Sequence, residues 1–267
     1  MTQDDGPRTI VVEAYGARLG VSAPDQQILE RVLEGLPEGW ERASADGDER
    51  ELRWRFAVMR DDAGDYRVRD GNAVETNCGE DLELAVGLLR LHLRRYVGYN
   101  ALDLVFVHAG VVGVRGRAIV VPGHSFSGKS TLVAELVRQG GVYYSDEYAV
   151  FGEDGRVRPY REPLAMRTTS GLRGRAVTAE QLGGTAGEEP IPVGLVALTT
   201  YRPGAEWDPS PLSAAQGLLA LLEHAVPVRE RPQQTLGVLR LALDGAEVLR
   251  GERGESAEAA RSLIERI

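Results

Sequence analysis

Hydrophobic and polar positions in the first part of the chain predict short strands and one helix. Brief apolar or alternating runs flank the Tyr15-Gly16 turn signal and predict a β-hairpin, and a second hairpin is predicted further along. Between them, apolar residues recur at helical spacing up to a segment that contains Pro37. The predicted strands are 9–14, 17–21, 52–56 and 66–68, and the predicted helix carries Ile28, Leu29, Val32 and Leu33. We therefore predict a small α+β accessory or recognition domain over residues 1–78.

The rest of the chain, residues 79–267, alternates apolar strand patterns with amphipathic helices, which predicts a mixed α/β (α+β) domain. Helical spacing over 80–97 predicts a long helix, and the nearly continuous apolar run 104–112 predicts a strand buried on both faces. Further strands are predicted at 118–121, 142–144, 148–151, 193–200, 236–243 and 248–249, and further helices over 131–140, after the Ser213 capping box and from Ser256 onward. Residues 168–190 lack a periodic run, which predicts a loop that is either a functional lid or disordered.

One stretch of this second domain carries a chemical motif, G-x-x-x-x-G-K-S (Walker A), between a predicted strand and a predicted helix. In such loops backbone N–H groups converge on phosphate oxygens, and the helix N-terminus adds partial positive charge. Lys129 is the only lysine in the chain, and its compact ammonium suits the β- and γ-phosphates better than a planar guanidinium. The predicted phosphate-binding residues are Gly123, His124, Ser125, Phe126, Ser127, Gly128, Lys129, Ser130 and Thr131.

Two carboxylates and one histidine stand out among apolar strand residues. Asp146 and Glu147 follow the predicted strand 142–144, and an acidic residue at such a strand end commonly holds Mg²⁺ in nucleotide-binding proteins. We predict Ser130, Asp146 and Glu147 as metal ligands, with a solvated acidic turn as the alternative for the two carboxylates. His108 lies inside a buried strand, where a core histidine bonded to a backbone carbonyl is the alternative to a functional role.

Composition narrows the class of partner. The 267 residues carry a formal charge of −9 and have a pI of about 5.1, which argues against a general nucleic-acid or anionic-membrane surface. No apolar run approaches the roughly 18 residues of a membrane span, and residues 1–8 lack the apolar core of a signal peptide. The single cysteine, Cys78, excludes an internal disulfide and is predicted to be a small, partly buried residue in a loop before a helix. We expect a cytoplasmic protein whose partners are neither nucleic acid nor membrane.

The order of these motifs resembles the kinase domain of HPr kinase/phosphorylase, which shares its P-loop nucleotide-binding core with phosphoenolpyruvate carboxykinase. The likeness covers roughly residues 103–165 and rests on His108-Ala109-Gly110-Val111-Val112, on the glycine-rich loop and on Ser145-Asp146-Glu147. It implies ATP- and Mg²⁺-dependent transfer of the γ-phosphoryl group to a serine-type hydroxyl on a small molecule, peptide or small protein. It also implies that Lys129 contacts the β- and γ-phosphates, that Asp146 accepts the substrate proton beside His108, and that copies of the chain can form a homo-oligomer.

The chain also departs from that family. Its loop carries His124 and Phe126 where relatives commonly have an acidic residue and more glycine, and the family's glycine-rich signature for recognising the HPr protein is not found. HPr itself is therefore not the expected acceptor. Glu162 is a further metal contact implied by the resemblance. The candidates for covering the transferring phosphate or binding an acidic acceptor, each with a solvated surface arginine as the alternative, are Arg161, Arg167, Arg173 and Arg175.

Two other functions fit the same motifs. One is a nucleotide-switched protein that hydrolyses NTP slowly or not at all and recruits a partner through residues 1–75. The other is a carboxykinase-like enzyme that acts on an oxoacid, which is disfavoured because no set of metal-binding lysine and histidine residues is visible in the sequence outside the loop. The kinase interpretation is the leading one, because the loop and the acidic strand end together supply both phosphate binding and a proton acceptor.

Overall fold

The computed structural model describes residues 7–43, 55–72, 74–124, 127–167 and 174–267, and the chain divides into two compact units, Met1–Leu102 and Asp103–Ile267. The boundary lies after helix α2 (Leu82–Asn100), whereas the sequence suggested a division between residues 78 and 79. Helix α2 packs on β4, β5, β6 and α1 of the first unit, with Ala85, Val86, Leu89, Leu93 and Val97 buried. Its apolar stripe thus belongs to the core of the first unit.

The first unit contains a 6-stranded sheet in the order β3-β1-β2-β4-β5-β6. Its elements are β1 (Arg8–Ala14), β2 (Ala17–Ala23), α1 (Gln26–Leu33), β3 (Trp40–Ala43), β4 (Arg55–Arg60), β5 (Tyr66–Arg69) and β6 (Glu75–Gly79). Both predicted hairpins are confirmed, although residues 52–54 of one predicted strand lie outside the described residues. The edge strands β3 and β6 escaped prediction because most of their residues are not buried and show no apolar alternation. Cys78 is buried shortly before α2 but lies in strand β6 and not in the predicted loop.

The second unit contains an 8-stranded mixed sheet in the order β11-β10-β7-β8-β14-β16-β15, with β9 beside β10 on the same edge of β7. Strands β8, β14 and β16 are parallel to one another. The strands are β7 (Leu104–Val114), β8 (Arg117–Pro122), β9 (Val142–Ser145), β10 (Tyr148–Gly152), β11 (Val157–Arg158), β14 (Val193–Tyr201), β15 (Ser210–Pro211) and β16 (Glu247–Arg253). A separate ribbon pairs β12 (Leu164–Arg167) with β13 (Gly174–Val177), which lies in the stretch predicted as a loop. The mixed α/β class is confirmed.

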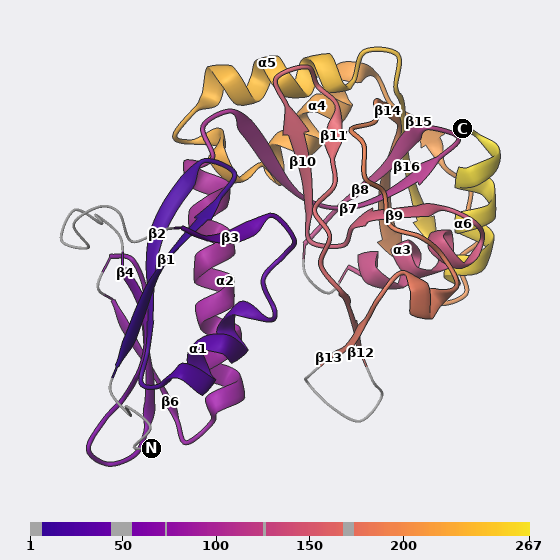
Figure 1. Ribbon diagram of the computed structural model, residues 1–267. Helices are drawn as coiled ribbons and strands as arrows, with labels where there is room; N and C mark the ends of the chain where they lie inside the picture. The colour runs from indigo at the N-terminus through magenta and orange to yellow at the C-terminus, as the bar shows by residue number, and fades with distance from the viewer. Residues whose placement is uncertain (1–6, 44–54, 73, 125–126, 168–173) are drawn as a thin grey trace. The chain divides into compact units, whose positions relative to one another are not determined.

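Helices cover both faces of this sheet (Figure 1). Helices α3 (Lys129–Arg138) and α6 (Ser256–Glu265) contribute to one hydrophobic core, and α4 (Ala214–Glu223) and α5 (Pro232–Ala242) contribute to the other. Neighbouring residues of β7 point to opposite cores, as Val111 packs with α4 and α5 while Val112 packs with α3 and α6. This two-sided burial explains why β7 has almost no polar residues.

One predicted strand is wrong, because most of the apolar run 236–243 belongs to helix α5. Pro232 starts this helix, and its buried residues Thr235, Val238, Leu239 and Ala242 recur at helical spacing. The run looked continuous in the sequence because Leu236 and Leu241 add apolar residues to the exposed face. A short apolar run of this length does not separate helix from strand.

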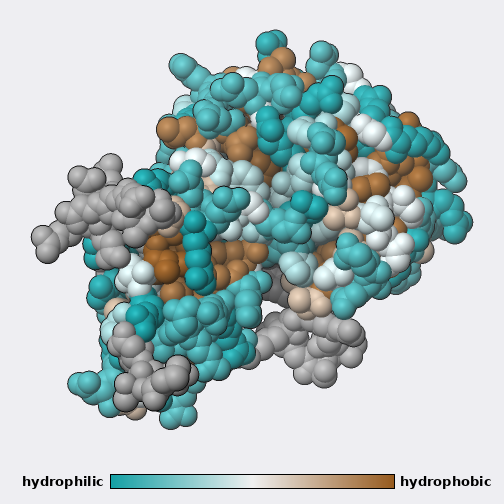
Figure 2. Space-filling model, in the orientation of Figure 1, coloured by the Kyte–Doolittle hydropathy of each residue, from teal (hydrophilic) through white to brown (hydrophobic). Residues whose placement is uncertain are grey.

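The surface view in Figure 2 shows hydrophilic residues over much of the displayed face, with hydrophobic residues in separate groups. In the second unit, large exposed apolar side chains include Leu219 on α4 and Leu236 and Leu241 on α5. Among the helices in the described ranges, none is both long and apolar enough to cross a bilayer.

Gly110 in β7 permits close packing of α3 on the sheet. A Cβ atom at Gly110 would lie 2.4 Å from Cγ2 of the buried Val133. We expect Gly110→Ala to lower the free energy of unfolding by about 1–3 kcal/mol, because the added methyl overfills the core. Val133→Ala in the same chain should recover part of this loss by removing the opposing methyls. Urea unfolding of both single variants and the double variant measures the coupling, and strictly additive losses would contradict the proposed clash.

Candidate functional site

The carboxyl ends of the parallel strands β8, β14 and β16 lie at one edge of the sheet, where ligands commonly bind in α/β folds. The glycine-rich loop, residues 123–128, follows β8 at this edge. Antiparallel pairing of β7 with β8 brings His108 to the start of the loop, and the N–H of Gly123 donates to the carbonyl of His108 at 3.3 Å. Tyr148 of β10 pairs with His108, so the acidic turn between β9 and β10 lies beside them. Three predicted site segments are therefore brought together by the sheet.

The described part of the glycine-rich loop is held by Lys129. The buried Lys129 side chain, which is 6% exposed, turns back and donates from Nζ to the carbonyls of Gly123 at 2.8 Å and His124 at 3.1 Å. Gly128 caps α3 with φ of 83°, a left-handed conformation that favours glycine. Burial lowers the pKa of Lys129, and the carboxylates of Asp146 and Glu147 oppose this shift. Ser125 and Phe126, also predicted to bind phosphate, lie outside the described residues.

Asp146 is buried next to this loop. Asp146 is only 9% exposed, which contradicts the alternative that this carboxylate lies in a solvated turn. Burial raises the pKa of Asp146 to about 7, against the opposing effects of a hydrogen bond from the Ser130 hydroxyl and the charge of Lys129. Among the residues that the structure describes, Asp146 Oδ1 is buried without a hydrogen-bond partner. This oxygen is therefore left to accept a proton or to coordinate a cation.

His108 faces the second carboxylate of the turn. Its Nε2 lies 3.7 Å from Oε1 of Glu147, which is only partly buried. Burial lowers the pKa of His108, and the Glu147 carboxylate and backbone carbonyl raise it. The imidazole thus lies beside a predicted metal ligand, and among the described residues its Nδ1 is buried without a hydrogen-bond partner.

The sequence carries no motif that marks His224 as a functional residue. It caps the C-terminus of α4, and its ring centroid lies 4.6 Å from that of His124 in an edge-on arrangement. Its backbone carbonyl accepts a hydrogen bond from the His108 N–H at 2.8 Å. Burial lowers the pKa of His224, and the nearby His124, His108 and Lys129 lower it further. Three of the four histidines in the chain therefore gather near Lys129.

Arg253 at the end of β16 was also missed, because no local motif marks it. It is 1% exposed and donates from Nη2 to the carbonyl of Gly128 at 2.7 Å and from Nη1 to Oγ of Ser256 at 3.0 Å. The pKa of Arg253 is lowered, mainly by burial of the guanidinium. Within the described residues, no carboxylate forms an ion pair with this guanidinium. Arg253 therefore ties the end of the glycine-rich loop to the junction of β16 and α6.

The remaining candidates lie in or next to the β12–β13 ribbon or outside the described residues. The carbonyl of Glu162 accepts a hydrogen bond from the Tyr143 hydroxyl, and the pKa of that phenol is raised by burial first and then by Asp146 and Glu162. Arg161 is partly buried, Arg167 and Arg175 belong to the β12–β13 ribbon, and Arg173 lies outside the described residues. The described residues contain no group of three or more His, Cys, Asp or Glu side chains placed to hold a metal ion. Magnesium commonly takes only one or two protein carboxylates, together with water and substrate phosphates, so Ser130 and Asp146 still suit it.

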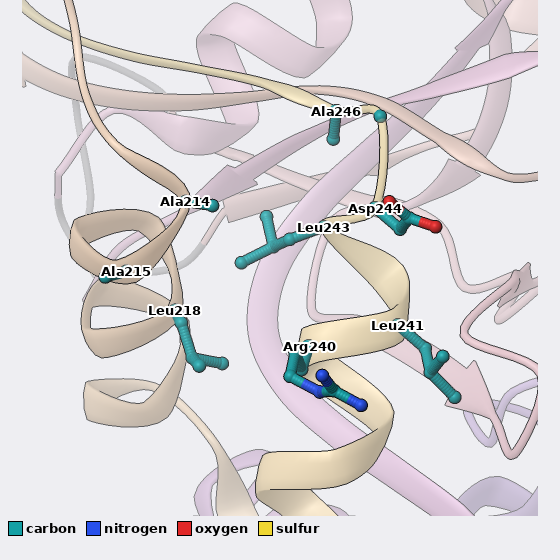
Figure 3. Close-up of a pocket in the computed structure, with 9 residues that line it drawn as sticks. Ala214, Ala215, Leu218, Arg240, Leu241, Leu243, Asp244 and Ala246 are labelled. Carbon is teal, nitrogen blue, oxygen red and sulfur yellow. The ribbon is translucent and has the colours of Figure 1, made fainter.

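A separate pocket of about 650 Å³ lies between α4, the end of α5 and the turn that follows it. Leu218 and Leu243 extend into the space between the two helices (Figure 3). Ala214 and Ala215 at the N-terminus of α4 line the pocket, whereas His224 caps the opposite end of that 10-residue helix, about 15 Å away at ~1.5 Å per residue. The pocket is thus separate from the glycine-rich loop, and Arg240 and Asp244 are its charged lining residues.

The arrangement around the glycine-rich loop can be compared with known proteins. A scan of the chain against models of protein families found no match, and a search among curated proteins found none. The chemistry of the site therefore rests on its own geometry. That geometry combines a buried ammonium, a buried carboxylate with an unpartnered oxygen, a hydroxyl and an imidazole at one edge of the sheet.

Proposed function

We propose that this protein is an ATP- and Mg²⁺-dependent kinase that transfers the γ-phosphoryl group to a serine-type hydroxyl, with a P-loop core like that of HPr kinase/phosphorylase. The observation that carries the proposal is the unpartnered Oδ1 of the buried Asp146, beside Ser130 and Lys129 of the G-x-x-x-x-G-K-S segment. A phosphate-binding loop alone suits any nucleotide-binding protein. A buried proton acceptor next to it suits transfer to a hydroxyl.

In the proposed reaction, the loop N–H groups and the Lys129 ammonium bind the β- and γ-phosphates of ATP. The ammonium exchanges its bonds to the carbonyls of Gly123 and His124 for bonds to phosphate oxygens. Ser130, Asp146 and Glu147 would hold Mg²⁺, which would neutralise charge on the phosphates.

Proton transfer falls to Asp146. Its Oδ1 accepts the proton of the acceptor hydroxyl while the hydroxyl oxygen forms a bond to the γ-phosphorus of ATP. The bond between the γ-phosphorus and the oxygen that bridges it to the β-phosphate breaks, and ADP is released. A pKa of about 7 suits a general base that works near neutral pH. His108 lies beside Glu147, and its imidazole stabilises the negative charge of that carboxylate.

The acceptor belongs to the class of serine-type hydroxyls on a small molecule, peptide or small protein. The ring of His124 contacts the ring of His224. The loop therefore presents an imidazole where relatives commonly have an acidic side chain. A changed surface at this point agrees with an acceptor other than the HPr protein. The first unit is a candidate for recognising that acceptor.

The proposal is tested by incubating the full chain with γ-labelled ATP, Mg²⁺ and a panel of free serine, serine-containing peptides and small proteins. We expect label on at least one hydroxyl acceptor, and a parallel reaction without acceptor measures hydrolysis. Label that appears only as inorganic phosphate with every acceptor would favour the nucleotide-switched alternative. Failure to bind ATP in calorimetry would contradict both functions.

A further inference from the structure

The strand order divides the surroundings of the glycine-rich loop into two flanks. On one side of β8 lie β7, β9 and β10, which carry His108, Asp146 and Glu147. On the other side lie β14 and β16, whose last residues are Tyr201 and Arg253. Tyr201 and Arg253 pair with each other across these parallel strands. The proposed phosphoryl-transfer groups therefore occupy one flank, and an aromatic–arginine pair occupies the other.

This division gives the bound nucleotide a direction. The γ-phosphoryl group must face the flank of Asp146, where the acceptor hydroxyl loses its proton. The β-phosphate lies over the loop and the N-terminus of α3, so the nucleoside end of the chain extends toward the opposite flank. Resting on the proposed function, we infer that Tyr201 is the platform on which the nucleobase stacks, with Arg253 as the residue that positions it.

The contacts of Tyr201 fit this role. Its side chain is adjacent to the loop, because Cβ of Tyr201 lies 3.9 Å from the position that a Cβ would take on Gly128. Cζ of Arg253 lies over the ring at 5.6 Å from its centroid, and the same guanidinium donates to the Gly128 carbonyl. Because Arg253 is buried, it covers the inner face of the ring. Tyr201 as a whole is 48% exposed, so it offers surface that a planar ligand can contact.

The backbone around Tyr201 is also held in place. The N–H of Arg202 donates to the carbonyl of Arg253 at 2.9 Å, and Arg202 Nε forms an ion pair with Oε2 of Glu252 at 2.8 Å. The ring therefore stands on a fixed strand end at the rim of the phosphate-binding loop. An exposed tyrosine with a fixed backbone loses little conformational freedom when a base stacks on it.

The test compares two ligands, Mg²⁺–ATP and Mg²⁺–tripolyphosphate, because the second has phosphates but no base. We expect Tyr201→Ala to weaken ATP binding roughly 10-fold in calorimetry and to leave tripolyphosphate binding unchanged. Tyr201→Phe should bind ATP like the wild type, since stacking needs the ring and not its hydroxyl. Thr200→Ala, an exposed neighbour on the same strand, is the matched control and should leave both affinities unchanged.

The outcomes separate this inference from the proposed function. If the wild type binds ATP and Tyr201→Ala binds it equally well, or loses both ligands equally, the base platform is contradicted while the kinase proposal stands. If the wild type binds neither ligand, the proposed function fails and the platform fails with it. Thermal unfolding of each variant without ligand verifies that Tyr201→Ala retains the wild-type fold.

Discussion

Asp146→Asn should lower the rate of phosphoryl transfer by about 10²–10⁴-fold, because the variant keeps the size of the side chain but loses the proton acceptor. ATP affinity measured without Mg²⁺ should stay the same or increase, since a carboxylate is removed from beside a polyanion. Single-turnover transfer to an accepted hydroxyl substrate measures the first effect, and calorimetry measures the second. Label transfer at the wild-type rate by Asp146→Asn would exclude Asp146 as the base.

The same substitution has an independent readout in stability. Burial raises the pKa of Asp146 from 3.8 to about 7, so between these values the folded protein holds a proton that the unfolded chain has lost. The stabilising contribution of this group is therefore complete below pH 3.8 and is lost as the pH rises to about 7. Asp146→Asn should remove this component of the pH dependence. Urea unfolding between pH 4 and 8 in metal-free buffer measures it, and identical pH profiles for both proteins would contradict the burial argument.

Lys129→Met should weaken ATP binding by roughly 10- to 100-fold, because each charge-assisted hydrogen bond to phosphate contributes about 1.5–3 kcal/mol. The free protein should also lose stability, since Lys129 Nζ no longer donates to the carbonyls of Gly123 and His124, although the relief of the burial of a charged group offsets part of this loss. Calorimetric titration with ATP measures the affinity, and thermal unfolding measures the stability.

Arg138→Met is the matched control for that experiment. Arg138 lies at the other end of α3, where it is exposed and pairs with Glu135 at 3.3 Å. The control removes the same single positive charge from the same helix but leaves the loop intact. Equal loss of ATP affinity in both variants would show that net charge and not the Lys129 contact determines binding.

Local patterns predicted the parts of the site that local interactions build. The loop lies between strand β8 and helix α3, as the motif and its apolar flanks predicted. The acidic turn was visible for the same reason, because Asp146 and Glu147 interrupt apolar neighbours. The burial of Asp146 was not visible, since it depends on how β7, β9 and β10 pair.

Long-range pairing explains what the sequence did not reveal. His224 reaches the loop because the end of α4 bonds to β7, and Arg253 reaches it because β16 pairs with β14. Neither residue has a motif of its own, and each is a hundred residues or more from its partner in the loop. Helix α5 was mistaken for a strand because its exposed face is also apolar. Contacts group α2 with the first unit, which the sequence did not reveal, because an apolar helical stripe does not indicate the unit on which it packs.

The bond between Arg253 and Gly128 also has a consequence for synthesis on the ribosome. The glycine-rich loop is made well before β16, yet its last carbonyl is held by a side chain 125 positions further along the chain. A nascent chain that stops short of Arg253 has the complete motif but lacks this support and the final parallel strand. We therefore expect ribosome-bound intermediates to acquire nucleotide affinity only after residue 253 has emerged from the exit tunnel.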